Sequence, residues 1–186
     1  MDDNWSEPDI VRGLQDGDSD AWAALCDQYS ERLWMYVARL IGSNEAAVAD
    51  VFQETLMAVA KGGRSLHDGS RLWAWLSSIG HNQCALYWRQ ANQRNTDLLV
   101  EERALCESAD VLELEETVAA VRQLLTGLPP DYSQILTAKY TEGLSAAEIA
   151  QQSGENLEAV RSRLARARKE FRTRYERLIE ATSEVN

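Results

Sequence analysis

The sequence predicts an all-α protein with two small helical domains joined by a flexible acidic linker. Apolar residues recur at steps of three and four along most of the chain, and no segment alternates apolar and polar residues as a half-buried strand does. A length of 186 residues leaves room for two small domains. The charge also changes along the chain, since residues 94–127 hold 3 basic and 8 acidic residues. We therefore expect domains at residues 1–93 and 112–186, with residues 94–111 as the linker.

The N-terminal domain is expected to contain four helices. The first begins near Pro8, which suits the first turn of a helix, and residues 16–18 break it. An apolar stripe predicts a long second helix that ends at Gly42. The glycines at 62–63 stop the third helix, and the fourth runs from about residue 71 to residue 90. The aromatic residues of the fourth helix are expected to pack mainly in the core: Trp73, Trp75, Tyr87 and Trp88.

The third helix is expected to be amphipathic. The stripe that it should bury consists of Val48, Phe52, Leu56 and Val59. The side chains that should face outward are Asp50, Glu54, Met57 and Lys61. Two exposed carboxylates one turn apart are either an ordinary solvated face or a surface that pairs with basic groups of a partner.

The C-terminal domain is expected to hold two further helices and then a helix-turn-helix. The first of these helices should end at Gly127, and the prolines at 129–130 open the next, which closes near Gly143. Residues 145–169 then predict a short helix, a tight turn and a longer helix with a basic tail. This order is typical of DNA-binding helix-turn-helix motifs.

Start and stop signals set the limits of the helix-turn-helix. Ser145 and Glu148 have the S-x-x-E spacing of a capping box, Gly154 suits the left-handed end of the first helix, and Asn156 caps the second. The second helix should bury Val160, Leu164, Ala167 and Phe171. Its opposite face carries Ser162, Ala165, Arg166 and Lys169, with Arg161 at its edge. This face would suit the major groove, although an arginine-rich solvated face is the plain alternative.

The net charge argues against tight unaided binding to nucleic acid. The whole chain carries a net charge of −11, and affinity for DNA comes mainly from neutralising phosphates. Only residues 159–177 are strongly basic, with 8 basic and 2 acidic residues. A DNA-binding role is therefore expected to need a partner.

Cysteine usage predicts reduced thiols in a cytoplasmic protein rather than a disulfide framework. Cys26, Cys84 and Cys106 are widely spaced and odd in number, and no C-x-x-C pair occurs. The two histidines, His67 and His81, lack ligand-like neighbours, so neither a metal nor another cofactor is expected. The acidic N-terminus has no apolar run of signal-peptide or membrane length, so we expect a soluble protein without direct membrane insertion.

Both halves of the chain carry motifs of one known family. Residues 128–169 resemble region 4 of the extracytoplasmic-function (ECF) group of bacterial sigma factors, with the markers LPP, EGLS, EIA and VRSRLARAR. The segment DVFQET at residues 50–55 is similar to the D-x-x-Q-E-x-F motif of region 2. Trp75, Ile79 and Asn82 match the A-W-L-x-x-I-A-x-N motif that follows. One helix-turn-helix alone is weak evidence, but both regions in the expected order are specific.

The resemblance implies an alternative sigma factor that responds to stress or another signal. Such a protein would bind the β′ clamp helices and the β subunit of core RNA polymerase, and would direct the enzyme to promoter DNA. The catalysis would belong to the polymerase, so no small-molecule substrate is expected. The resemblance also allows an anti-sigma factor as a partner. Two alternatives are a helix-turn-helix regulator that does not bind core polymerase and an adaptor that lacks promoter activity.

The resemblance assigns residues to three contact sites. The contacts to core polymerase would be Asp50, Gln53 and Glu54. The contacts to the minus-ten promoter element would be Arg64, Arg71, His81, Asn82 and Arg89. The contacts to the minus-thirty-five element would be Arg161, Ser162, Arg163, Ala165, Arg166 and Lys169. Arg163 lies, like Arg168, at the edge of the buried stripe and suits either a phosphate contact or packing.

Three residues depart from the pattern of the family. His81 stands at a position that is usually basic, and Leu86 stands where an acidic residue is common. Glu155, in the turn of the helix-turn-helix, stands where the family usually has an apolar residue.

Overall fold

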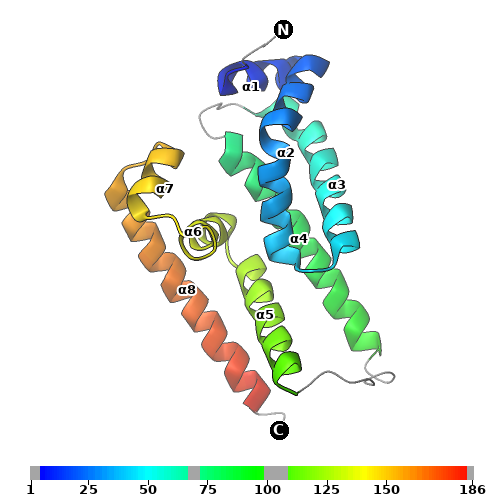
Figure 1. Cartoon of the computed structure of the whole chain (residues 1–186), viewed down its shortest axis with the longest axis vertical. Coiled ribbons are helices and arrows are strands. Elements are labelled where there is room, and N and C mark those ends of the chain that lie inside the picture. Colours follow the sequence, from blue (N-terminus) through cyan, green and yellow to red (C-terminus); the bar gives the residue numbers. More distant parts are fainter. Residues whose placement is uncertain (1–4, 67–71, 99–108, 184–186) are drawn as a thin grey trace.

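The computed structural model describes residues 5–66, 72–98 and 109–183, which form eight α-helices, one 3₁₀ turn and no strand (Figure 1). The all-α prediction is therefore confirmed for this part of the chain. The elements are α1 (Glu7–Asp16), α2 (Ser19–Ile41), α3 (Glu45–Gly62), η1 (Gly63–Ser65), α4 (Leu72–Leu98), α5 (Ala109–Gly127), α6 (Pro130–Tyr140), α7 (Ala146–Ser153) and α8 (Leu157–Ser183).

Local chemistry explains where the first helices begin and end. Gly17 closes α1 in the left-handed conformation, with a φ of 77°, which other residues adopt with strain. The Asp18 side chain then accepts a hydrogen bond from the backbone N–H of Asp20 and caps α2. Asn44 caps α3 in the same way, by accepting a hydrogen bond from the N–H of Ala47.

The N-terminal helices α1–α4 pack around two neighbouring apolar clusters. The first cluster joins α1, α2 and α4 and contains buried residues such as Ile10, Leu25, Leu72 and Leu76. The second joins α2, α3 and α4 and contains Val37, Leu40, Val48 and Cys84. Burial raises the pKa of the Cys84 thiol to about 12, so this cysteine stays a protonated apolar core residue.

The buried side of α3 differs from the predicted stripe. Val48 and Val59 are buried as expected, but Phe52 is only half-buried, and Val51 and Thr55 are buried in its place. Phe52 lies instead against Trp34 of α2, with ring centroids 5.2 Å apart. The buried side of α3 is thus rotated from the predicted stripe, and Thr55 lies opposite Gly80 of α4, where an added Cβ would be 3.6 Å from Cγ2 of Thr55.

The fourth helix is longer than the sequence predicted. It continues past residue 90 to Leu98, and α5 already begins at Ala109. Residues 90–98 contain neither glycine nor proline, so nothing in the local sequence stops the helix there. The predicted linker was residues 94–111, and both of its ends are helical in the structure. Residues 99–108 lie outside the described part of the chain.

Helices α7 and α8 form the predicted helix-turn-helix, and they pack with α6 around a third apolar cluster. Its buried members are Leu128, Ile135, Leu136, Ile149, Ala150, Val160, Leu164 and Ala167. The capping box of Ser145 and Glu148 is present in both directions. Gly154 has a φ of 65°, and Asn156 accepts a hydrogen bond from the N–H of Glu158 at 2.8 Å, as the sequence predicted.

The N-terminal and C-terminal helices pack against one another. Helices α5 and α6 contact α2 and α4, as Figure 1 shows for the centre of the molecule. Arg39 of α2 forms a half-buried salt bridge with Glu142, with 2.7 Å between Nη1 and Oε1. Gln134 of α6 donates a hydrogen bond to the backbone carbonyl of Ala74 at 3.4 Å. None of the described helices combines the length and the apolar character needed to span a bilayer.

Candidate polymerase and DNA interfaces

The acidic residues predicted to bind core polymerase lie together on the outer face of α3. Asp50, Gln53 and Glu54 are all exposed, whereas Val51 and Thr55 between and beside them point into the core. Within the described part of the chain, none of the three side chains takes part in a salt bridge. Their carboxylates are therefore available to cationic groups of a partner.

The surface predicted to meet the minus-ten element runs along one side of α4. Asn82 and Arg89 are exposed and lie seven residues, or about two turns, apart on the same face. Leu86, one of the departures from the family pattern, is exposed between them. Arg64 is exposed in η1. Arg71 lies outside the described residues.

His81 does not belong to this exposed surface. Its side chain is only 2 % exposed, and its Nε2 lies 3.0 Å from the carbonyl oxygen of Leu128, just before α6. Burial lowers the pKa of His81, although hydrogen bonding to the backbone of Leu128 and Thr126 opposes this effect. The neutral ring thus joins α4 to the C-terminal helices. In this arrangement the C-terminal helices cover the His81 side chain, so its predicted contact with DNA stays a prediction that requires these helices to move away.

The aromatic residues of α4 have the core role that the sequence predicted. Trp73 packs on both apolar clusters of the N-terminal helices, and the guanidinium of Arg32 lies 4.0 Å from the centre of its ring. Trp88 donates a hydrogen bond from Nε1 to the backbone carbonyl of Leu40 at 3.0 Å. Trp75 and Tyr87 are half-buried. In this arrangement the four rings position α4 within the bundle.

Helix α8 has the two faces that the sequence predicted. Its buried side rests on the third apolar cluster through Val160, Leu164 and Ala167. The exposed residues, here called the front of α8, are Arg161, Ser162, Ala165, Arg166 and Lys169. The Arg161 guanidinium forms an exposed salt bridge with Glu158, with 2.6 Å between Nη1 and Oε1. Arginines on such a face can bond guanine edges or phosphates.

Arg163 is the exception among the predicted minus-thirty-five contacts. It is half-buried, and its Nη2 lies 2.5 Å from Oε2 of Glu155 in the turn before α8. Both residues line a polar cleft between the N-terminal helices and the helix-turn-helix. Arg163 therefore lies at the edge of the front of α8 and is paired with Glu155 in this arrangement, and its predicted contact with DNA stays a prediction.

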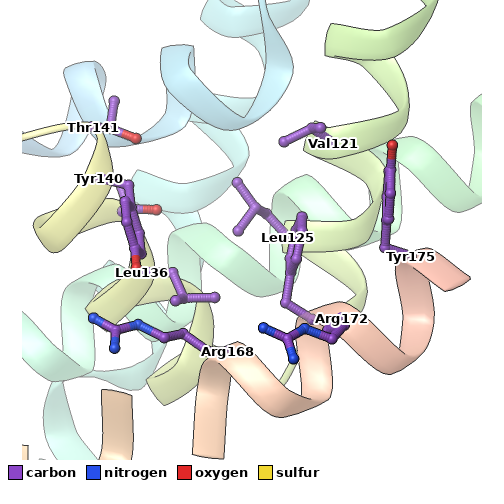
Figure 2. A pocket seen from close by; sticks show the side chains of 10 residues that line it. Val121, Leu125, Leu136, Tyr140, Thr141, Arg168, Arg172 and Tyr175 are labelled. Atoms are coloured by element: carbon purple, nitrogen blue, oxygen red, sulfur yellow. The ribbon is translucent and has the colours of Figure 1, made fainter. Parts of the chain in front are cut away.

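Arg168 is exposed and lies beside Tyr140 of α6. Its guanidinium lies 5.7 Å from the ring centre of Tyr140, within reach of a cation–π interaction. Figure 2 shows Arg168 and Tyr140 at one end of an apolar hollow of about 500 Å³ between α5, α6 and α8. Leu125, Leu136 and Phe171 line the same hollow. The structure shows this contact with Tyr140 for an exposed Arg168, and the phosphate contact that the sequence also allowed stays a prediction.

Comparison with known proteins identifies the two halves. Residues 25–94 match the model of sigma-70 region 2, and residues 119–171 match the model of sigma-70 region 4. The chain belongs to the ECF group of RNA polymerase sigma factors, whose members are transcription initiation factors.

The relatives align over most of this chain. It is 29 % identical over 159 residues to the ECF sigma factor BldN of Streptomyces coelicolor. This alignment covers 83 % of this chain and 60 % of BldN. It is 27 % identical over 191 residues to the ECF sigma-E factor of Salmonella typhimurium. That alignment covers 96 % of this chain and 99 % of the relative. Among solved structures, CnrH in complex with the cytosolic domain of CnrY is similar with a TM-score of 0.48 and 25 % identity, over 90 % of this chain and 95 % of that one.

Proposed function

We propose that this protein binds core RNA polymerase and directs promoter-specific transcription initiation as an alternative sigma factor. The observation that carries the proposal is the presence, in one chain, of region 2 with an exposed acidic face on α3 and region 4 with an exposed basic face on α8. An acidic face suits a basic protein surface, and a basic face suits DNA. Neither face alone distinguishes a sigma factor from an ordinary regulator, but the pair does.

The proposed roles follow the two halves of the chain. Residues 1–93 dock on the β′ clamp helices through Asp50, Gln53 and Glu54, and read the minus-ten element along α4. Residues 112–186 read the minus-thirty-five element with the front of α8. The chain itself is not an enzyme, because the bond-forming chemistry belongs to the polymerase. It acts in the cytoplasm, where the polymerase and the chromosome are.

Reading both promoter elements requires the two regions to separate. The minus-ten and minus-thirty-five positions differ by about 25 base pairs, or about 85 Å of B-DNA at 3.4 Å per pair. Helix α6 contacts both α4 and α8, so where they meet α6 these two helices are at most about 20 Å apart, which is twice a helix-packing distance. We therefore infer that the packed arrangement opens when the chain engages polymerase and promoter, which would also uncover His81.

The test is reconstitution with core RNA polymerase. The purified chain should co-elute with core enzyme in gel filtration, and the resulting holoenzyme should give run-off transcripts from a subset of a genomic promoter library. Sequencing these transcripts would also define the promoter. A chain that never co-elutes would be a helix-turn-helix regulator instead. A chain that co-elutes without producing transcripts would be an adaptor with the fold alone.

A further inference from the structure

The turn of the helix-turn-helix contains a charge pair that joins it to the recognition helix. Glu155 lies between Gly154, which ends α7, and Asn156, which caps α8. Its backbone N–H donates to the carbonyl of Ala150 at 3.0 Å, so the residue is fixed in the turn. From there its carboxylate reaches Arg163, 2.5 Å away, in the second turn of α8.

This pair differs from the neighbouring one in its surroundings. The side chains of Arg163 and Glu155 are 28 % and 22 % exposed, whereas those of Arg161 and Glu158 are 60 % and 74 % exposed. A half-buried pair is less screened by water and salt than an exposed one, and it holds the arginine in one geometry. In the packed arrangement Arg161 is therefore freer than Arg163 to exchange its carboxylate partner for a phosphate. Glu155 and Arg163 both belong to the helix-turn-helix, so their pairing does not itself depend on the N-terminal helices.

Arg163 would be well placed for DNA without this carboxylate. It precedes Arg166 by three residues, so the two side chains are neighbours on the helix surface at the edge of the front of α8. The edge of a recognition helix is where phosphates of the groove walls are contacted.

We propose that Glu155 withholds Arg163 from the DNA backbone, and so sets a lower affinity and a weaker salt dependence for region 4. The inference rests on the proposed function, because it assumes that α8 binds DNA. Glu155 is thus a positioning residue that acts through Arg163. Releasing Arg163 would add one phosphate contact, which is independent of the base sequence.

The experiment uses holoenzyme and a fluorescent duplex of a promoter recovered by run-off transcription, with anisotropy measured at several salt concentrations. Glu155→Gln removes the charge with little change in shape, and Glu155→Ile also removes the hydrogen bond. Both should bind more tightly than the native chain, with a slope of log affinity against log salt that is steeper by about 0.9. The gain should shrink about threefold between roughly 50 and roughly 200 mM salt.

Two controls separate release of Arg163 from a general change in charge. Glu170→Gln removes one negative charge from α8, at a carboxylate paired with Arg174 further along the helix, and should leave the slope unchanged. In Glu155→Gln/Arg163→Ala the slope should return to the native value. Arg163→Ala should cost more affinity in the Glu155→Gln background than in the native chain.

The outcomes distinguish this inference from the proposed function. If holoenzyme forms and transcribes, but both Glu155 variants keep the native slope, the pair is only a structural link and the inference fails. If the gain persists in Glu155→Gln/Arg163→Ala, general electrostatics explains it and the inference also fails. If no holoenzyme forms, the proposed function fails. The same variants are then measured as full free chains on a random-sequence duplex at low salt, with the same criteria.

Discussion

At the scale of single residues, two side chains make contacts that their own helices do not predict. His81 is a polar residue on a helix with an exposed polar face, yet it is buried against the carbonyl of Leu128 from a distant part of the sequence. Arg163 is an arginine beside the proposed DNA-binding face of α8, yet a carboxylate from the preceding turn holds it. In both cases one partner outside the helix decides what the side chain contacts.

The buried ring of His81 predicts a loss of stability in mild acid. Its pKa is lower in the folded chain than the ordinary value of 6.5, so the unfolded chain takes up the proton first as the pH falls. The stability that neutral His81 supplies is therefore fully present above about pH 6.5, and it is lost as the pH falls from there through the lower pKa of the folded chain. The denaturation midpoint in urea should fall more for the native chain than for His81→Gln between about pH 7.5 and about pH 5.5. Equal falls in the two proteins would contradict this.

Arg161 and Arg166 should be needed for promoter choice but not for binding polymerase. Both are exposed on the front of α8, and each base contact supplies about 1–3 kcal/mol of discrimination. Replacing either by alanine should abolish or strongly reduce promoter-specific run-off transcription, while co-elution with core enzyme stays native. Arg177→Ala, which removes an exposed charge near the end of the same helix, is the matched control. A variant that loses both activities together would indicate misfolding instead.

At the scale of elements, the outer face of α3 is the surface that we propose binds core polymerase. The helix is held by its Asn44 cap and by a buried side centred on Val51 and Thr55. Reversing charge on the exposed side therefore leaves the packing intact. This separation of faces makes α3 suitable for a test of polymerase binding.

Asp50→Lys/Glu54→Lys should weaken binding to core polymerase by more than about tenfold, because like charges placed across an interface cost several kcal/mol. Circular dichroism should show the native helix content. Asp27→Lys/Glu31→Lys on α2 is the matched control, since both carboxylates are exposed and have the same spacing of four residues. Unchanged affinity of the α3 variant, or an equal loss in the control, would remove this face from the interface.

At the scale of the whole molecule, the packing of region 4 on region 2 governs which surfaces are accessible. Among the described residues, the polar contacts between the regions include the Arg39–Glu142 salt bridge, the His81–Leu128 hydrogen bond and the Gln134–Ala74 hydrogen bond. Leu125 adds apolar contact with the second cluster.

Glu142→Arg should open the packed arrangement, since it places two arginines opposite one another in a half-buried site. Small-angle X-ray scattering should show a larger radius of gyration than for the native chain. The charge-swapped Arg39→Glu/Glu142→Arg should return to the native value. Glu176→Arg, at an exposed position on α8, controls for the change in net charge. Identical scattering of Glu142→Arg and native chain would show that this pair does not hold the regions together.

The sequence by itself determined the helices, their caps and the faces of α8, because these depend on neighbours within one or two turns. The capping box at Ser145 and the buried stripe from Val160 to Ala167 are examples. The family motifs, which are also local, identified both regions. Only the tertiary structure decided the rotation of α3, the burial of His81 and the pairing of Arg163 with Glu155. These features depend on which groups lie opposite a side chain in space, and helical periodicity carries no information about such distant partners.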